Sequence, residues 1–124
     1  MKKITLLVFM IAVSFGLQSQ ISTPAASPSS TLIQKVGLTD VTVEYSRPSM
    51  RGRTIFGDLV PYDKLWRTGA NARTKITFSE NVNIGGQELK AGSYAIFTKP
   101  GASSWEVIFY TDYNGGGTPS DWDE

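Results

Sequence analysis

The stretch TKITFSENVNIGGQELKAGSYAIFTKPGASSWEVIFY, residues 74–110, decides the fold class. Its apolar residues alternate with polar ones, and clusters of glycine, proline or serine separate the alternating segments, a pattern typical of antiparallel β-strands. Gly85 and Gly86 can adopt the positive φ angles that a tight turn requires. We therefore predict a strand at 74–79, followed by a hairpin across these two glycines.

Further strands are predicted on both sides of that hairpin. Two longer strands, 93–98 and 105–110, flank a turn-rich connection, and alternation also predicts strands at 41–46 and 32–36. After the N-terminal segment, no apolar pattern of period 3.6 lasts three turns, so helix is limited to a turn or two at 62–66. The predicted fold is all-β: an antiparallel β-sandwich or open barrel of short strands with one long ordered loop.

The N-terminal residues predict export. Lys2 and Lys3 precede the apolar run 4–17, and small or polar residues follow near a plausible cleavage point, as in a secretory signal peptide. The predicted organisation is a signal peptide at 1–20, a Pro/Ser-rich linker at 21–30 and a β domain at 31–124. The apolar run falls short of the roughly 20 residues that span a bilayer, so we expect no stable membrane span after signal removal.

Composition restricts both location and chemistry. The 124 residues include no cysteine and no histidine. Lipid attachment to a processed N-terminal cysteine is therefore excluded, and the predicted location is the periplasm, the cell surface or the medium, not that of a lipoprotein. The absence of these two residue types also removes thiolate nucleophiles, Cys-ligated metals and the usual neutral-pH proton shuttle. We predict no cofactor, no metal site and no catalytic residues, because no convincing acid/base pair is present.

The charge of the chain does not favour nucleic acid. Removing Lys2 and Lys3 leaves 10 cations against 11 anions, a net charge of −1. The charges are unevenly distributed, however. Between residues 47 and 75, seven Lys and Arg residues accompany only two Asp residues, while the region after residue 105 contains acidic residues and no cation.

The segment 47–73 is longer than loops in compact domains usually are, and such loops are commonly functional or disordered. Its apolar residues predict that it is ordered and packed against a sheet. Arginine forks suit carboxylate, phosphate or sulfate groups. The candidate ligand-binding residues are Arg47, Arg51, Arg53, Trp66, Arg67, Asn71 and Arg73. The structural alternative, which we weight more heavily, is that Arg67 and Arg73 pair with Asp58, Asp63 or backbone carbonyls to hold an irregular loop.

The last residues form a turn-rich acidic tail. An EF-hand-like calcium loop starting at Asp112 is a poor match, because Gly116 stands at a ligand position. Tyr113 and Trp122 are expected to be exposed. No predicted strand covers the edge of strand 105–110, which is an aggregation hazard, so we expect the chain to be truncated at its C-terminus.

Three motifs resemble one known family: SRPSMRGRTIFG at 46–57, PYDKLWRTGANART at 61–74 and LKAGSYAIF at 89–97. Together they are similar to the DUF2911 family of exported bacterial proteins, commonest in the Bacteroidetes, over nearly all of the chain from residue 31. The family is of unknown function, so the resemblance implies no catalytic residue, cofactor or substrate. Its members generally continue beyond residues 121–124 with further strands, which agrees with a truncated chain.

The function predicted from these observations is non-catalytic binding of an anionic or carbohydrate ligand at the bacterial envelope. The alternative is a structural or assembly module that binds a protein partner through an open strand edge. A hydrolase that uses Asp58 and Asp63 comes third, since the neighbouring arginines favour ionised carboxylates over a general acid.

Overall fold

The computed structural model describes residues 22–120 and 122, and the fold is all-β. The predicted signal peptide at 1–20 lies outside the described residues. The strands are β1 Ser29–Val36, β2 Thr39–Ser46, β3 Lys75–Phe78, β4 Val82–Ile84, β5 Gln87–Leu89, β6 Gly92–Pro100 and β7 Trp105–Tyr110. Within the described ranges no helix is long and apolar enough to cross a membrane.

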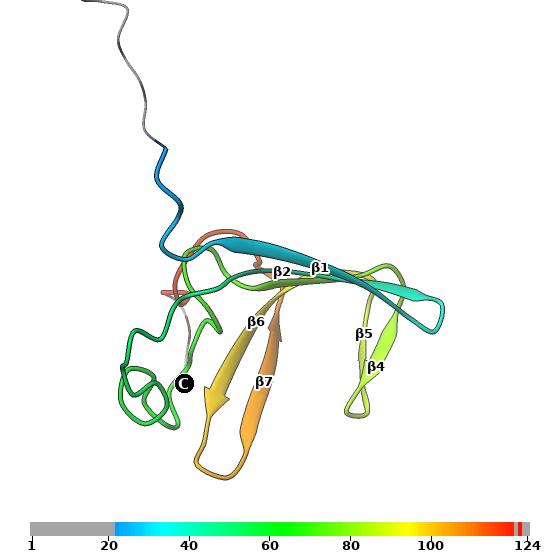
Figure 1. The fold of residues 1–124 in the computed structure, drawn as a ribbon. Coiled ribbons are helices and arrows are strands. Elements are labelled where there is room, and N and C mark those ends of the chain that lie inside the picture. The colour runs from blue at the N-terminus through cyan, green and yellow to red at the C-terminus, as the bar shows by residue number, and fades with distance from the viewer. Residues whose placement is uncertain (1–21, 121, 123–124) are drawn as a thin grey trace, which may run out of the picture.

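Five strands form one antiparallel sheet in the order β1-β2-β3-β6-β7, and β4-β5 forms a separate hairpin. The sheet does not close into a barrel. In Figure 1, β1 and β2 run together across the molecule, while the β6-β7 and β4-β5 hairpins extend from them to one side. The predicted all-β, sandwich-like antiparallel fold is therefore confirmed.

The glycine hairpin forms as predicted. Gly85 and Gly86 have φ angles of 61° and 85°, and the Asn83 side-chain oxygen accepts a hydrogen bond from the Gly86 N–H at 3.1 Å. No helical turn forms at 62–66, in agreement with the limit of a turn or two set by the sequence. Asp63 there has a φ of 58°, and Trp66 instead exchanges two backbone hydrogen bonds with Thr98 of β6, which satisfies its backbone without a helical turn.

The core lies on both faces of β6. On one face, Phe78, Tyr94 and Phe109 form an aromatic cluster whose ring centroids are 6.3–6.4 Å apart. On the opposite face, the fully buried Phe97 packs against Tyr110 and Trp122. Opposite side chains in an antiparallel pair share a face, so the alternation in the sequence produces these two layers.

The long segment between β2 and β3 is ordered, as predicted. Phe56, Trp66 and Trp105 pack edge to face, with centroids 4.9–6.3 Å apart, and this contact attaches the segment to the start of β7. Val60 is buried, and its N–H donates to the Ile55 carbonyl at 2.8 Å. Apolar packing and local hydrogen bonds thus hold a loop without regular structure.

Candidate functional site

The arginines of the long loop bond mainly to backbone carbonyls. Arg53 donates from Nε to the Met50 carbonyl and from a terminal nitrogen to the Ser49 carbonyl, both at 3.0 Å. Arg67 donates to the carbonyls of Gly69 at 3.3 Å and Asn71 at 3.4 Å. These contacts match the structural alternative, in which guanidinium groups satisfy the backbone of an irregular loop.

Arg73 is the one buried arginine among the described residues. It donates to the Asp112 carboxylate at 3.0 Å and to the carbonyls of Asp112 and Gly117 at 2.8 and 3.2 Å. Its guanidinium group also lies over the rings of Phe97 and Tyr110, 5.7 and 5.9 Å from their centroids. Arg73 therefore joins the end of the long loop to residues 112–117 of the tail.

The other candidate residues lie in different settings. The backbone N–H of Arg47 donates to the Pro28 carbonyl, and the Asn71 side chain donates to the Ser27 carbonyl at 3.2 Å. Arg51 is exposed and occupies a turn with a φ of 52°. Trp66 belongs to the aromatic cluster with Phe56 and Trp105. The observed contacts thus distribute the seven residues over several places, and a shared ligand-binding role stays a prediction.

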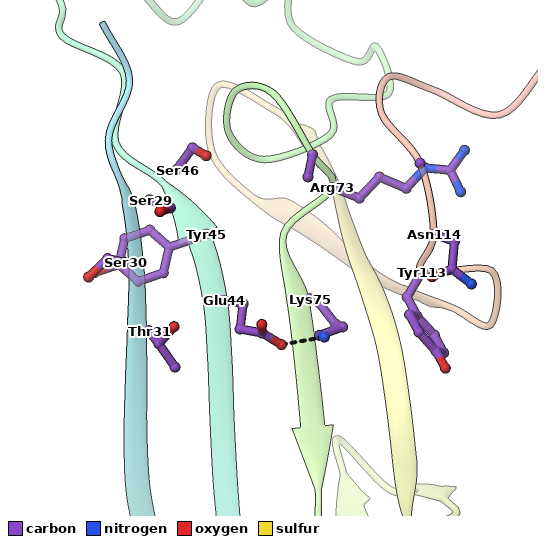
Figure 2. A pocket seen from close by; sticks show the side chains of 12 residues that line it. Ser29, Ser30, Thr31, Glu44, Tyr45, Ser46, Arg73, Lys75, Tyr113 and Asn114 are labelled. Atoms are coloured by element: carbon purple, nitrogen blue, oxygen red, sulfur yellow. Dashed lines mark ion pairs between the residues drawn. The ribbon is translucent and has the colours of Figure 1, made fainter. Parts of the chain in front are cut away.

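Arg73 borders a polar cleft of about 380 Å³ that the sequence did not reveal. The cleft lies between the ends of β1, β2 and β3 on one side and tail residues 113–115 on the other (Figure 2). Its lining comprises Ser29, Ser30, Thr31, Glu44, Tyr45, Ser46, Ala72, Arg73, Lys75, Tyr113, Asn114 and Gly115. From here on we call this space the polar cleft.

Strand register explains the floor of the polar cleft. Ser29 pairs with Ser46, Thr31 with Glu44, and Glu44 with Lys75, so their side chains share one face of the sheet. Lys75 forms an ion pair with Glu44, and its ammonium nitrogen lies 5.8 Å from the centroid of the Tyr113 ring. Figure 2 shows Lys75 between these two side chains.

The tail wall of the polar cleft is held by Arg73 and Asp112. The Arg73 N–H donates to the Gly115 carbonyl at 3.2 Å, and the Asp112 carboxylate accepts the Asn114 N–H at 3.1 Å. The hydrogen bond from the Arg73 side chain, followed by that from the Asn114 N–H, lowers the pKa of Asp112 below its ordinary value. Tyr113 and Asn114 are thereby fixed facing the strand ends.

Comparison with family models identifies the chain. The model of DUF2911, described as a protein of unknown function, matches residues 27–124. The chain belongs to the DUF2911 family. The searches of curated proteins and of solved structures returned no match.

In this DUF2911 chain, the calcium loop considered above would start at Asp112 and end at residue 123, which lies outside the described residues. One carboxylate oxygen of Asp112 accepts from Arg73 and the other from the Asn114 N–H. In the part of the chain that the structure describes, no group of three or more acidic, His or Cys residues gathers. Hydrogen bonds and an isolated bridge between Ala72 and Gly116 shape this tail.

The expected exposure of Trp122 is wrong. Its ring lies 5.7 Å from that of Tyr110 and 6.0 Å from that of Phe97, and the residue is half-buried. The exposure of Tyr113 is confirmed. Both aromatic residues are in the acidic tail, so local composition could not show which of them is exposed. Trp122 is the one that contacts aromatic rings on β6 and β7.

Proposed function

We propose that this protein is exported and binds a carbohydrate, without catalysis, in the polar cleft. The observation that supports the proposal is the lining itself, where hydroxyl, amide, carboxylate and ammonium groups surround about 380 Å³. Small-ligand sites commonly have volumes of about 300–1,000 Å³. Each sugar hydroxyl both donates and accepts hydrogen bonds, and a mixed lining of this kind can satisfy both.

The Tyr113 side chain supplies the apolar part of the proposed site. It is exposed at the cleft wall, where its ring can contact the C–H groups of a sugar while its hydroxyl group forms a hydrogen bond. Asn114, next to it, offers one donor group and one acceptor group. The backbone of both residues is fixed through Asp112 and Arg73, so little ordering of this wall is needed on binding.

An anionic ligand is less favoured than a neutral one. Lys75 already has the Glu44 carboxylate as its partner, and Arg73 has that of Asp112. An anion entering the polar cleft would compete with these carboxylates for their cations. We therefore expect a neutral sugar to bind with an affinity that changes little with salt concentration.

Export, the second part of the proposal, would determine which glycans the protein encounters. Residues 1–20 have the lysines and apolar run of a signal peptide, which would place the remaining chain in the periplasm, on the cell surface or in the medium. The proposed ligand is then a glycan of the bacterial envelope or its surroundings. Cleavage near residue 20, read by mass spectrometry of the N-terminus of protein secreted by a bacterial host, tests this step.

The binding step is tested with labelled protein on a glycan microarray, followed by calorimetric titration of the strongest oligosaccharide. Tyr113→Ala removes the apolar wall and should weaken binding about tenfold, the equivalent of roughly 1.4 kcal/mol. Tyr62→Ala is the matched control, because Tyr62 is 43% exposed and Tyr113 38%, but Tyr62 does not line the polar cleft. Binding that Tyr113→Ala leaves intact, or that vanishes at high salt, would contradict the proposal.

A further inference from the structure

The tail wall of the polar cleft contains an asparagine that is followed by glycine. Asn114 and Gly115 both line the cleft and both are exposed, and Figure 2 shows the Asn114 side chain next to Tyr113. In such a pair the backbone nitrogen of the glycine can attack the side-chain carbonyl of the asparagine, because no Cβ crowds the approach. The cleft that we propose as a binding site thus contains a reactive side-chain amide.

The peptide group between Asn114 and Gly115 is not held by the hydrogen bonds of this wall. Among residues 22–120 and 122, no hydrogen bond engages the Asn114 carbonyl or the Gly115 N–H. The groups on either side are held: the Asn114 N–H donates to the Asp112 carboxylate at 3.1 Å, and the Gly115 carbonyl accepts from the Arg73 N–H at 3.2 Å. Gly115 has a φ of 95°, and no heavy atom outside its chain neighbours lies within 4 Å of where a Cβ would be. Turning this peptide group toward the Asn114 side chain therefore breaks no hydrogen bond of its own and meets open space.

The other three asparagines of the chain differ from Asn114 in both respects. They are followed by alanine, valine and isoleucine, whose Cβ atoms crowd the backbone nitrogen, most of all where the side chain is β-branched. Each also uses its side-chain amide in a hydrogen bond to the backbone. The Asn71 side chain donates to a carbonyl at 3.2 Å, and those of Asn81 and Asn83 accept from N–H groups at 2.9 and 3.1 Å. Within the described residues, no such bond engages the Asn114 side chain.

We propose that Asn114 is a site of spontaneous deamidation, through a cyclic succinimide formed with Gly115. Hydroxide removes the proton of the Gly115 N–H, and the nitrogen forms a bond to Cγ of Asn114. The bond from Cγ to the amide nitrogen then breaks, and this nitrogen takes up a proton and leaves as ammonia. Water adds to one of the two ring carbonyls and opens the ring. Opening at the side-chain carbonyl leaves an aspartyl residue, and opening at the main-chain carbonyl leaves an isoaspartyl linkage.

The reaction changes both the charge and the backbone of the cleft wall. A carboxylate replaces the neutral amide, so it competes with Glu44 for the Lys75 ammonium group. The isoaspartyl linkage runs through Cγ and lengthens the main chain between the hydrogen bonds to Asp112 and Arg73. The effect on binding rests on the proposed function: a wall with altered charge and spacing should bind the sugar less tightly.

Incubation of the folded chain at mildly alkaline pH, followed by peptide mapping in a mass spectrometer, tests the site. Asn114 should deamidate at least about tenfold faster than Asn71, Asn81 or Asn83, a difference of about 1.4 kcal/mol in barrier height. It should also react no more than about tenfold slower than in a synthetic peptide of residues 111–119, because the fold leaves its peptide group unbonded. Asn114→Gln is the matched control and should not react, since its ring would be larger. A smaller advantage over the other asparagines, or stronger protection by the fold, overturns the proposal.

Calorimetric titration of fresh and fully deamidated protein measures the effect on binding, with the strongest oligosaccharide of the microarray as the probe. Deamidation should weaken binding about tenfold. Asn114→Gln should bind equally well before and after the same incubation. The two proposals fail in different ways. Deamidation that leaves binding unchanged contradicts a sugar site in the polar cleft, whereas sugar binding by a chain whose Asn114 stays intact overturns the deamidation site alone.

Discussion

β6 and β1 both contain apolar residues in alternating patterns, yet their surroundings differ greatly. Phe97 of β6 has no exposed surface, whereas Ile33 of β1 is 70% exposed. β6 is hydrogen-bonded on both sides, to β3 and Trp66 on one and to β7 on the other. β1 pairs only with β2.

The difference between the two strands lies in what covers their faces. The long loop packs near the end of β6 on one face through Trp66, and Trp122 and Arg73 contact Phe97 on the other. No described segment covers Ile33 or Val36 in this way. Apolar sequence alone therefore does not determine burial. We expect the stability of the described fold to be concentrated around β6.

The largest effect is expected from Phe97→Ala. This substitution leaves a cavity between Tyr110, Trp122 and the Arg73 guanidinium group, and it should lower the free energy of unfolding by about 3–5 kcal/mol. Urea denaturation followed by tryptophan fluorescence measures the loss. Phe56→Ala, at a partly exposed ring, is the control and should cost clearly less. Similar losses for both variants would show that β6 is not the centre of stability.

Arg73→Met should have the next largest effect. Met keeps much of the apolar stem but loses three hydrogen bonds to the tail and the contacts with two aromatic rings. We expect a loss of about 2–3 kcal/mol in unfolding free energy, measured in the same urea assay. Arg51→Met, at an exposed position of the same loop, should change it by less than about 0.5 kcal/mol. An equal response of the two variants would contradict a structural role for Arg73.

The strands could be predicted from the sequence because alternation and turn residues act locally. The double-glycine turn at 85–86 and the pairing of strands 93–98 and 105–110 were both predicted and are present in the structure. The predicted strand positions agree with the observed ones to within a few residues. The lack of helix at 62–66 agrees with the limit of a turn or two set by the sequence. Backbone hydrogen bonds with Thr98, which is distant in the sequence, determine the conformation of Trp66 there.

The polar cleft could not be predicted, because four separate segments of the chain contribute to it. Thr31, Glu44 and Lys75 come together only through strand register, and Tyr113 reaches them only because Arg73 binds Asp112. Charge composition drew attention to all the arginines of the long loop, Arg73 included. Arg73, which organises the tail, is buried, and no local pattern distinguishes it from the others.

A smaller, pH-dependent effect follows from the lowered pKa of Asp112. The group binds its proton less readily in the folded protein than in the unfolded chain, where its pKa is near 3.8. Its contribution to stability is therefore complete above that value, and it is lost as the pH falls through the folded-state pKa. The free energy of unfolding is measured by urea denaturation, from pH 6 down to pH 2, for the unmodified chain and for Asp112→Asn. Asp112→Asn should be less stable above about pH 4 and approach the unmodified chain below it. A stability difference that does not change with pH would contradict this role.

The smallest effect on the free energy of unfolding is expected on the exposed strand β1, from Ile33→Thr. Ile33 pairs with Thr42 at the exposed edge, and threonine keeps the β-branched shape that suits a strand. The change should therefore alter the unfolding free energy by less than about 0.5 kcal/mol. Ile96→Thr on β6 makes the same chemical change beside Phe109 and Thr74, and it should cost more than about 1 kcal/mol because a hydroxyl group replaces packed apolar surface. Urea denaturation of the two variants measures the effect of the surroundings of each strand, because the substituted residue types are identical. If Ile33→Thr proves as costly as Ile96→Thr, some surface in solution covers β1 as well.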